Sequence, residues 1–222
     1  MLAVAPKLMF RLHRHAMVKF SPIEAEQDRV VVIASGPSAA GPWLDKPAGC
    51  AVIAVAGAVD GLPWAPDYWF TIDPSPINMT RFHRLAPQTK AILGVEWDVG
   101  PEAHEVKYRQ DFTGAHLICL KRGVGMTEDR RVLGVGNSGR AAVHLAMHLG
   151  AKRIAVFGVD GTEDGHWHNP DLKSGNLRSL GRGCAELHRD GVEIVFASDG
   201  RSTVQGQTLA TPEATLTWIE SR

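Results

Sequence analysis

The chain is built from short, uninterrupted apolar runs that are separated by polar and glycine-rich turns. Such runs lie at residues 30–34, 50–59, 68–72, 90–95, 115–121, 154–159 and 192–197. Continuous rather than alternating apolar character is typical of strands that are covered on both faces, as in a parallel sheet. Residues 105–110 fit a further strand at an edge. We therefore predict a mostly parallel sheet between layers of helices.

Helical patterns occur between these strands. Apolar residues recur on one face of 138–149, and Gly150 provides the left-handed stop that ends many helices. Asn169 followed by Pro170 has the form of a helix start, which predicts a second helix over 170–189. Two shorter patterns predict a basic helix over 77–85 and a C-terminal helix that begins after Thr211.

The length of the chain, 222 residues, matches a single α/β domain. We place a Rossmann-like, doubly wound nucleotide-binding domain at 29–205, an N-terminal arm at 1–28 and a helical tail at 206–222. The first twenty residues are basic, but they lack the apolar segment and the cleavage site of a targeting peptide.

The composition limits the classes of partner. Lysine plus arginine and aspartate plus glutamate each number 24, so the chain has no overall field that attracts nucleic acid or an anionic membrane. Three cysteines without paired spacing fit a reducing compartment. No apolar run approaches the ~20 residues that span a bilayer. We expect a cytoplasmic protein that acts on small molecules, without nucleic acid or membrane span, and that is compatible with a homo-oligomer.

Polar turns follow several predicted strands, and the carboxyl ends of parallel strands meet at one edge of a sheet, where ligands bind. The first turn contains Ser35, Gly36, Pro37 and Ser38. Its glycine allows a ligand to approach closely, its proline fixes the turn, and its serines offer hydroxyl groups. The turn is neither a Walker A loop nor a G-x-G-x-x-G fingerprint. Gly57 lies in the corresponding turn after the next strand.

The start of the helix after residue 136 is a candidate phosphate site. Asn137, Ser138 and Gly139 lie where unpaired N–H groups and the positive end of the helix dipole suit an anion. The alternative is an ordinary helix N-cap by Asn137 or Ser138. Residues 121–133 are rich in charge and glycine, and we predict a mobile loop that could close over such a site.

Acidic residues and histidines complete the set of candidates. Asp73 follows a strand and precedes a proline, which fits a Mg²⁺ or ribose ligand or, alternatively, an Asx turn. Asp160 ends another strand, and His166 and His168 follow it. A histidine there suits a general base for an acceptor hydroxyl. The alternatives are surface histidines, or an H-x-H metal site with Asp160 or Asp164.

The order of several segments resembles that of the archaeal 6-hydroxymethylpterin diphosphokinases. The segments are VIASGPSA, APDYWFTIDP and NSGRAAVHLAMHLGAKRIAVFGVDG, followed by a histidine and the strand VEIVFAS. The same order is similar to motility-associated flagellin glycosyltransferases and to the small bacterial CMP-sialic-acid-dependent sialyltransferases. The resemblance covers residues 30–205.

The resemblance implies roles for particular residues. A nucleotide would be held by Gly36, Pro37 and Ser38 and by Asn137, Ser138 and Gly139. His168 would act as the base, with His166 as the second choice, and Asp73 would lie at the metal–phosphate end.

The chain also departs from these families. The sialyltransferases usually have asparagine where this chain has Ser35, and another near Ala56-Gly57, which weakens a cytidine-specific interpretation. We further expect no extra domain of the kind with which flagellin-modifying members grip a protein, and this favours a small acceptor.

Together these features predict a nucleotide-dependent transferase of the diphosphokinase type. ATP would lie along the crevice, with Mg²⁺ held by Asp73 and, as a second candidate, Asp160. The catalytic set is then His168, His166 and Asp160, with a histidine to deprotonate the acceptor hydroxyl. The alternatives are a CMP-sugar-dependent glycosyltransferase and a nucleotide-binding module without turnover.

Overall fold

The computed structural model describes residues 9–12, 16–19, 22–41, 43, 45–96, 112–122, 125–135, 137–162, 164–173 and 183–221. The edge strand that we predicted at 105–110 lies outside the described residues.

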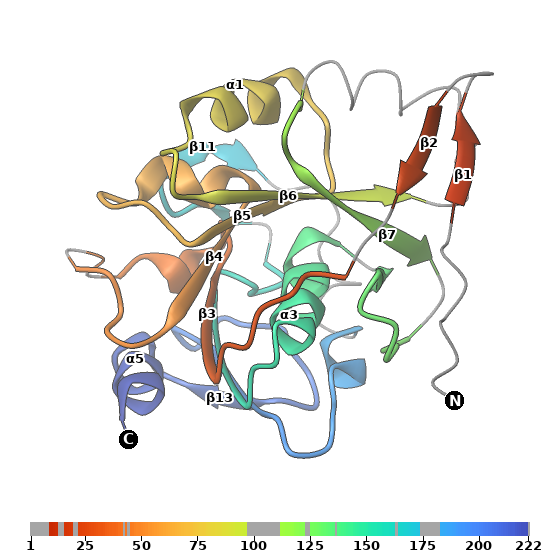
Figure 1. The fold of residues 1–222 in the computed structure, drawn as a ribbon. Coiled ribbons are helices and arrows are strands. Elements are labelled where there is room, and N and C mark those ends of the chain that lie inside the picture. Colours follow the sequence, from red (N-terminus) through yellow and green to blue (C-terminus); the bar gives the residue numbers. More distant parts are fainter. Residues whose placement is uncertain are drawn as a thin grey trace.

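A single parallel sheet forms the centre of the molecule (Figure 1) and has nine strands among the described residues. Side by side, these are β13 (Thr208–Ala210), β12 (Glu193–Ala197), β9 (Arg153–Phe157), β3 (Arg29–Ile33), β4 (Ala51–Val55), β5 (Tyr68–Thr71), β6 (Lys90–Glu96), β7 (His116–Arg122) and β8 (Val132–Val135). Because adjacent strands all run parallel and helices cover both faces, the predicted doubly wound α/β class is confirmed.

The chain reverses its direction across the sheet at β3. From β3 it proceeds outward through β4 to β8, and it then returns to place β9 on the other side of β3. Val31 of β3 is therefore in register with Val52 of β4 on one side and with Ala155 of β9 on the other. In open α/β sheets such a point leaves a crevice at the carboxyl ends of the strands.

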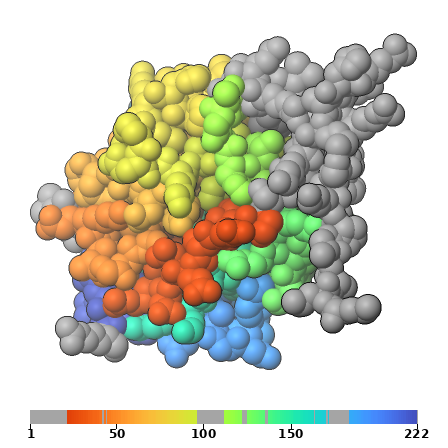
Figure 2. All heavy atoms as spheres, in the orientation of Figure 1, coloured from red at the N-terminus to blue at the C-terminus, as the bar shows by residue number. Residues whose placement is uncertain are grey.

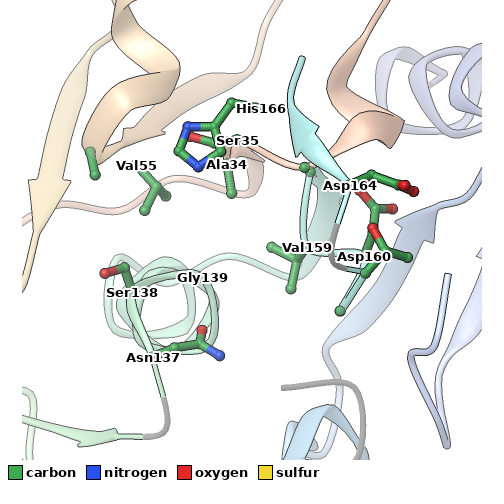
Figure 3. A pocket seen from close by; sticks show the side chains of 15 residues that line it. Ala34, Ser35, Val55, Asn137, Ser138, Gly139, Val159, Asp160, Asp164 and His166 are labelled. Atoms are coloured by element: carbon green, nitrogen blue, oxygen red, sulfur yellow. The ribbon is translucent and has the colours of Figure 1, made fainter. Parts of the chain in front are cut away.

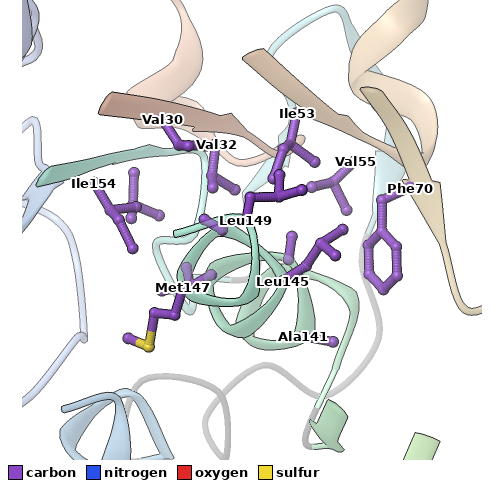
Figure 4. Close-up of a cluster of buried hydrophobic side chains, with 14 of the residues drawn as sticks. Val30, Val32, Ile53, Val55, Phe70, Ala141, Leu145, Met147, Leu149 and Ile154 are labelled. Atoms are coloured by element: carbon purple, nitrogen blue, oxygen red, sulfur yellow. The ribbon is translucent and has the colours of Figure 1, made fainter. Parts of the chain in front are cut away.

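Helix α3 (Ser138–His148) covers the middle of one face of the sheet. Figure 4 shows its apolar residues beneath Val30, Val32 and Ile53, and Leu145 and Leu149 are fully buried there. The Asn137 side chain caps this helix, as one of the sequence alternatives expected. Burial of every residue from 141 to 149 makes α3 an internal support of the fold.

The other face carries α5 (Pro212–Glu220), α1 (Pro76–Arg84) and the 3₁₀ turn η2 (Ala56–Gly61). Val31 and Ile33 alternate with the residues that face α3, and they pack with Ile219 of α5. The predicted C-terminal helix is confirmed, with the Thr211 hydroxyl accepting a hydrogen bond from the Ala214 amide at 3.2 Å. Part of the predicted tail thus belongs to the sheet and its covering layer.

Residues 22–28 cross the outer side of α3, and Figure 2 shows this stretch in red on the surface. The Gln27 amide donates to the Leu149 carbonyl at 2.9 Å. The Arg130 guanidinium donates to the carbonyls of Ile23 and Ala25, each at 3.0 Å. Ahead of this stretch, β1 (Met9–Leu12) and β2 (Ala16–Lys19) form an antiparallel pair.

Two predicted segments differ in the structure. The helix expected over 170–189 is wrong at its start, because β11 (Asn169–Lys173) pairs antiparallel with β10 (Gly165–His166). Residues 174–182 lie outside the described part, and 184–186 form the 3₁₀ turn η3. The 121–133 loop is also wrong at both ends, because β7 continues to Arg122 and β8 begins at Val132 as a parallel partner of β7.

Among the described residues, no helix combines the length and the apolar character needed to cross a membrane.

Candidate functional site

A pocket of about 210 Å³ opens at the point where the sheet reverses its order (Figure 3). It lies at the carboxyl ends of β3, β4 and β9 and at the start of α3. Seven of the predicted site residues line it: Ser35, Gly36, Asn137, Ser138, Gly139, Asp160 and His166. Pro37, Ser38, Gly57, His168 and Asp73 are not among the lining residues. The turn that begins at Ser35, the start of α3 and the segment from Asp160 to His166 therefore meet at this pocket, whereas Asp73 and Gly57 do not line it.

The start of α3 supplies the pocket with hydrogen-bond donors. The Asn137 side-chain oxygen accepts from the Arg140 amide at 3.0 Å, and the Asn137 carbonyl accepts from the Ala141 amide. The amides of Ser138 and Gly139, in the first turn, have no carbonyl partner within the helix. They carry the positive end of the helix dipole into the pocket.

Gly139 fixes how closely this helix approaches the sheet. A Cβ atom at Gly139 would lie 2.9 Å from Cγ2 of Val159, which also lines the pocket. The absence of a side chain at Gly139 therefore lets the helix start lie against the segment that leads from β9 to Asp160.

The loop at Gly36–Ser38 does not present free amides to the pocket. The Gly36 amide donates to the Gly158 carbonyl at 2.8 Å, and the Ser38 amide donates to Oδ2 of Asp160 at 2.9 Å. The Ser38 hydroxyl, which is almost fully buried, accepts from the Gly158 amide at 2.9 Å. Pro37 has no amide hydrogen. This loop therefore shapes the wall and holds Asp160, and its Gly36 and Ser38 amides are already engaged.

Asp160 is a buried carboxylate, with 3% of its surface exposed. Its Oδ1 atom is screened from solvent and has no hydrogen-bond partner among the described residues. Burial raises the pKa of its carboxyl, although the Ser38 hydrogen bonds act in the opposite direction. A Cβ atom at Gly36 would lie 2.4 Å from Oδ2 of Asp160, so the loop glycine makes room for this side chain.

His166 is the histidine that faces the pocket (Figure 3). Burial lowers the pKa of its imidazole, and the Arg81 charge lowers it further. The ring is therefore held in the neutral form that a general base requires.

His168 lies next to His166, with the two ring centres 5.4 Å apart. Both ring nitrogens of His168 are screened from solvent and have no hydrogen-bond partner among the described residues. Burial lowers the pKa of this imidazole too, and the neighbouring His166 adds to the effect. A Cβ atom at Gly57 would lie 3.2 Å from its Nε2 and 2.9 Å from the Arg81 guanidinium. His168 and Gly57 therefore belong to a packed cluster with Arg81.

Trp167, between the two histidines, anchors the β10–β11 turn to β3. Its amide donates to the Ser35 carbonyl at 3.0 Å, and its indole N–H donates to the Ala34 carbonyl at 3.1 Å. The indole packs into the core beside Trp43 and Trp64. We did not predict this role, although an aromatic residue between two histidines was a visible signal.

Asp73 forms a turn immediately before α1. Its Oδ1 accepts from the Ser75 amide at 3.1 Å, and its carbonyl accepts from the Asn78 side chain at 2.9 Å. This is the Asx-turn alternative of the sequence analysis. Asn78 in turn accepts from Arg81, which is paired with Asp60 at 2.7 Å.

The structure does not bring the two predicted Mg²⁺ ligands together at the pocket, because Asp160 lines it and Asp73 does not. Oδ1 of Asp73 is engaged with the Ser75 amide before α1. In the described part of the chain, no three side chains of histidine, cysteine, aspartate or glutamate gather where they could hold a metal ion. The Mg²⁺ requirement stays a prediction from the sequence.

Ala56, which precedes Gly57 in the turn after β4, lines the pocket. Its φ of 46° is in the left-handed region, which costs a residue with a Cβ on the order of 1 kcal/mol. Its carbonyl accepts the indole N–H of Trp69 at 2.9 Å, which helps to hold this backbone. A strained residue at the end of β4 fits a site whose shape is fixed by its surroundings.

No protein-family model matches the chain, and no curated protein matches it significantly. The geometry thus provides a pocket with helix amides at one end, carboxylates at the other, and a neutral imidazole above.

Proposed function

We propose that the protein is a nucleotide-dependent transferase that uses the pocket at the β3–β9 reversal. The observation that supports this most directly is the first turn of α3, because Ser138 and Gly139 at the start of this helix line the cavity. A helix start of this kind binds phosphate through its N–H groups and its dipole. The resemblance to the diphosphokinases points to the same class of ligand and to the cytoplasm, where ATP is abundant.

In this proposal the phosphates lie at α3 and the acceptor hydroxyl lies beneath His166. The acceptor oxygen attacks the β-phosphorus of ATP while neutral His166 takes the hydroxyl proton. The bond from the β-phosphorus to the bridging oxygen of the α-phosphate breaks, and AMP leaves. The described residues contribute mainly positioning and charge stabilisation to such a reaction.

The binding part of the proposal is tested by titration calorimetry with ATP, CTP and CMP. In Ser138→Asp a carboxylate enters the first turn of α3, where it favours the helix dipole but repels a bound phosphate. We expect at least about a tenfold loss of affinity with an unchanged or higher melting temperature. Ser138→Asn is the matched neutral control and should keep most of the affinity. Lack of binding by all three nucleotides would refute the proposal.

The catalytic part is tested with the two histidines. His166→Gln should retain nucleotide binding but lose turnover, because the base is removed from the pocket. His168→Gln should change the melting temperature more than the chemical step, because His168 is packed with Arg81 and Gly57.

The same titration, together with activity assays in a metal chelator, identifies the nucleotide that donates the transferred group. Tight binding of CMP, with activity that is indifferent to a chelator, would favour a CMP-sugar donor. Binding of ATP, with activity that is lost in chelator, would favour diphosphate transfer and the Mg²⁺ requirement that we predicted from the sequence.

A further inference from the structure

We infer that the end of the pocket opposite α3 binds the vicinal hydroxyls of a ribose, through the carboxylates of Asp160 and Asp164. This inference rests on the proposed function, and it names the part of the nucleotide that the pocket encloses.

The pocket has two ends of opposite character. Figure 3 shows Asp160 and Asp164 together on one side, while Asn137 and Ser138 lie at the start of α3 on another. Val159 links them, because it packs against Gly139 and immediately precedes Asp160. A ligand that spans the pocket therefore meets amide donors at one end and carboxylate acceptors at the other.

Asp160 provides the observation that points to a ligand at the acidic end. It lines the pocket and is 3% exposed, yet its Oδ1 atom has no hydrogen-bond partner among the described residues. A buried polar atom of this kind normally has a partner, and a charged one without a partner is costly. A hydroxyl group on a ligand would supply the missing donor.

Asp164 forms the outer part of the same end and is already oriented. Its Oδ2 accepts from the Arg201 guanidinium at 3.1 Å, and Arg201 is also paired with Asp199. Nearly half of the Asp164 side chain is exposed, so a ligand can reach it. Arg201 holds the Asp164 carboxylate and partly balances the negative charge of Asp160, Asp164 and Asp199.

The chemistry of the two ends sets the direction of the ligand. Carboxylates repel a phosphate, which places the phosphate at α3. Carboxylates accept hydrogen bonds from hydroxyl groups, and an acidic residue that binds ribose hydroxyls is a recurrent device in parallel α/β sheets.

The size of the pocket is consistent with a sugar and its phosphate. A volume of about 210 Å³ is below the ~300 Å³ at which pockets begin to enclose drug-sized ligands. Apolar side chains of Ala34, Val55 and Val159 line the walls, where the carbon atoms of a sugar would lie. The base would then project out of the pocket.

The test is a cycle that combines a change in the protein with a change in the ligand. ATP, 2′-deoxyATP, CMP and 2′-deoxyCMP are titrated calorimetrically into the wild type, Asp164→Ala and Asp160→Asn. Asp190→Ala is the control, because Asp190 is an exposed acid paired with His188 outside the pocket. Circular dichroism melts verify that each variant folds.

We expect the wild type to bind each ribonucleotide at least tenfold more tightly than its 2′-deoxy form. Asp164→Ala should reduce this ratio to near one, while Asp190→Ala should preserve it. Asp160→Asn should reduce the ratio in part, since an amide retains one acceptor oxygen.

The outcomes separate this inference from the proposal on which it rests. Equal affinities for ribose and deoxyribose forms in the wild type, or an undiminished ratio in Asp164→Ala, would overturn the inference and leave the proposed function standing. If none of the four nucleotides binds, both are overturned.

Discussion

Replacing Asp160 by asparagine should make the protein more stable at neutral pH. Asparagine has the same shape, and its side-chain oxygen can still accept the hydrogen bond from the Ser38 amide, which is 2.9 Å long in the structure. What the substitution removes is a negative charge on a side chain that is 3% exposed. The cation that acts on that charge, Arg201, is itself engaged with Asp199 and Asp164.

The magnitude follows from the unpartnered Oδ1 atom. A buried acceptor without a partner costs about 1–3 kcal/mol, and more when it is charged. Because the amide nitrogen that replaces Oδ1 also lacks a partner but carries no charge, we expect a gain of about 1–2 kcal/mol in the free energy of unfolding. For a chain of this size that corresponds to a rise in melting temperature of about 2–8 °C.

The stability difference between Asp160→Asn and the wild type should depend on pH, and the pKa of Asp160 gives its sign. The folded pKa of Asp160 is raised above its ordinary value of 3.8, so the carboxyl is harder to ionise in the fold than in the unfolded chain. Its stabilising influence is fully present below pH 3.8 and is lost as the pH rises through the folded pKa. The advantage of Asp160→Asn should therefore be small in acid and should grow to a plateau toward neutral pH.

The assay is urea unfolding followed by tryptophan fluorescence at a series of pH values. Asp199→Asn is the matched control, because hydrogen bonding from Arg201 lowers the pKa of Asp199 and gives the opposite sign. That control should be slightly less stable than the wild type at neutral pH. A lower stability of Asp160→Asn at pH 7 would refute this reasoning, because it would mean that the ionised carboxylate has a stabilising partner.

Two further predictions concern the packing around the site. Gly36→Ala should lower the free energy of unfolding by about 1–3 kcal/mol in urea titrations, because the new Cβ would lie 2.4 Å from Asp160 and 2.7 Å from the Gly158 carbonyl. Gly41→Ala, whose nearest neighbour would be 3.8 Å away, should be close to neutral, and equal losses in the two variants would contradict the explanation. On α3, burial lowers the pKa of His144 to about 3, and His148 next to it adds to the effect, so His144 should stay neutral from pH 5 to 8. Its Nδ1 accepts from the Gly134 amide and its Nε2 faces the Thr127 carbonyl, so long-range ¹H–¹⁵N spectra should show the Nε2–H form, and a signal that titrates near pH 6.5 would contradict it.

The strands of the sheet could be predicted because each segment has, on its own, the uninterrupted apolar character of a buried strand. Val30 to Ile33 are apolar without interruption, and the structure buries all of them between the two helical layers. β8 was missed because residues 121–133, which mix charged residues and glycine, look like a loop. Its strand conformation comes from pairing with β7, in which Gly134 is in register with Lys121.

The β10–β11 turn was mistaken for a helix start because Asn169-Pro170 is ambiguous when it is considered alone. A proline is also tolerated in a short edge strand, where its missing N–H is not needed. The deciding contacts join Trp167 to Ala34 and Ser35, more than a hundred residues earlier in the chain. Local patterns contain no information on such contacts.

The candidate site was predicted in its parts but not in its arrangement. The turns after β3 and β9 and the start of α3 were identified from glycine and serine content, and they do line one pocket. Which histidine faces it depends on how Trp167 is anchored. Similarly, the role of the Ser38 amide depends on Asp160, and only the folded chain brings these two residues together.

The reversal of strand order at β3 has a consequence for folding during synthesis on the ribosome. β3 pairs on one side with β4, about twenty residues later, and on the other with β9, roughly 120 residues later. A ribosome that adds ~5–20 residues per second needs on the order of 6–25 seconds to bridge that interval. Throughout this time the edge of β3 that will pair with β9 is unpaired, and the part of the pocket that follows β9 is missing. Mutations that slow the arrival of residues 153–157 should therefore expose the nascent chain to chaperones and proteases before any ligand can protect it.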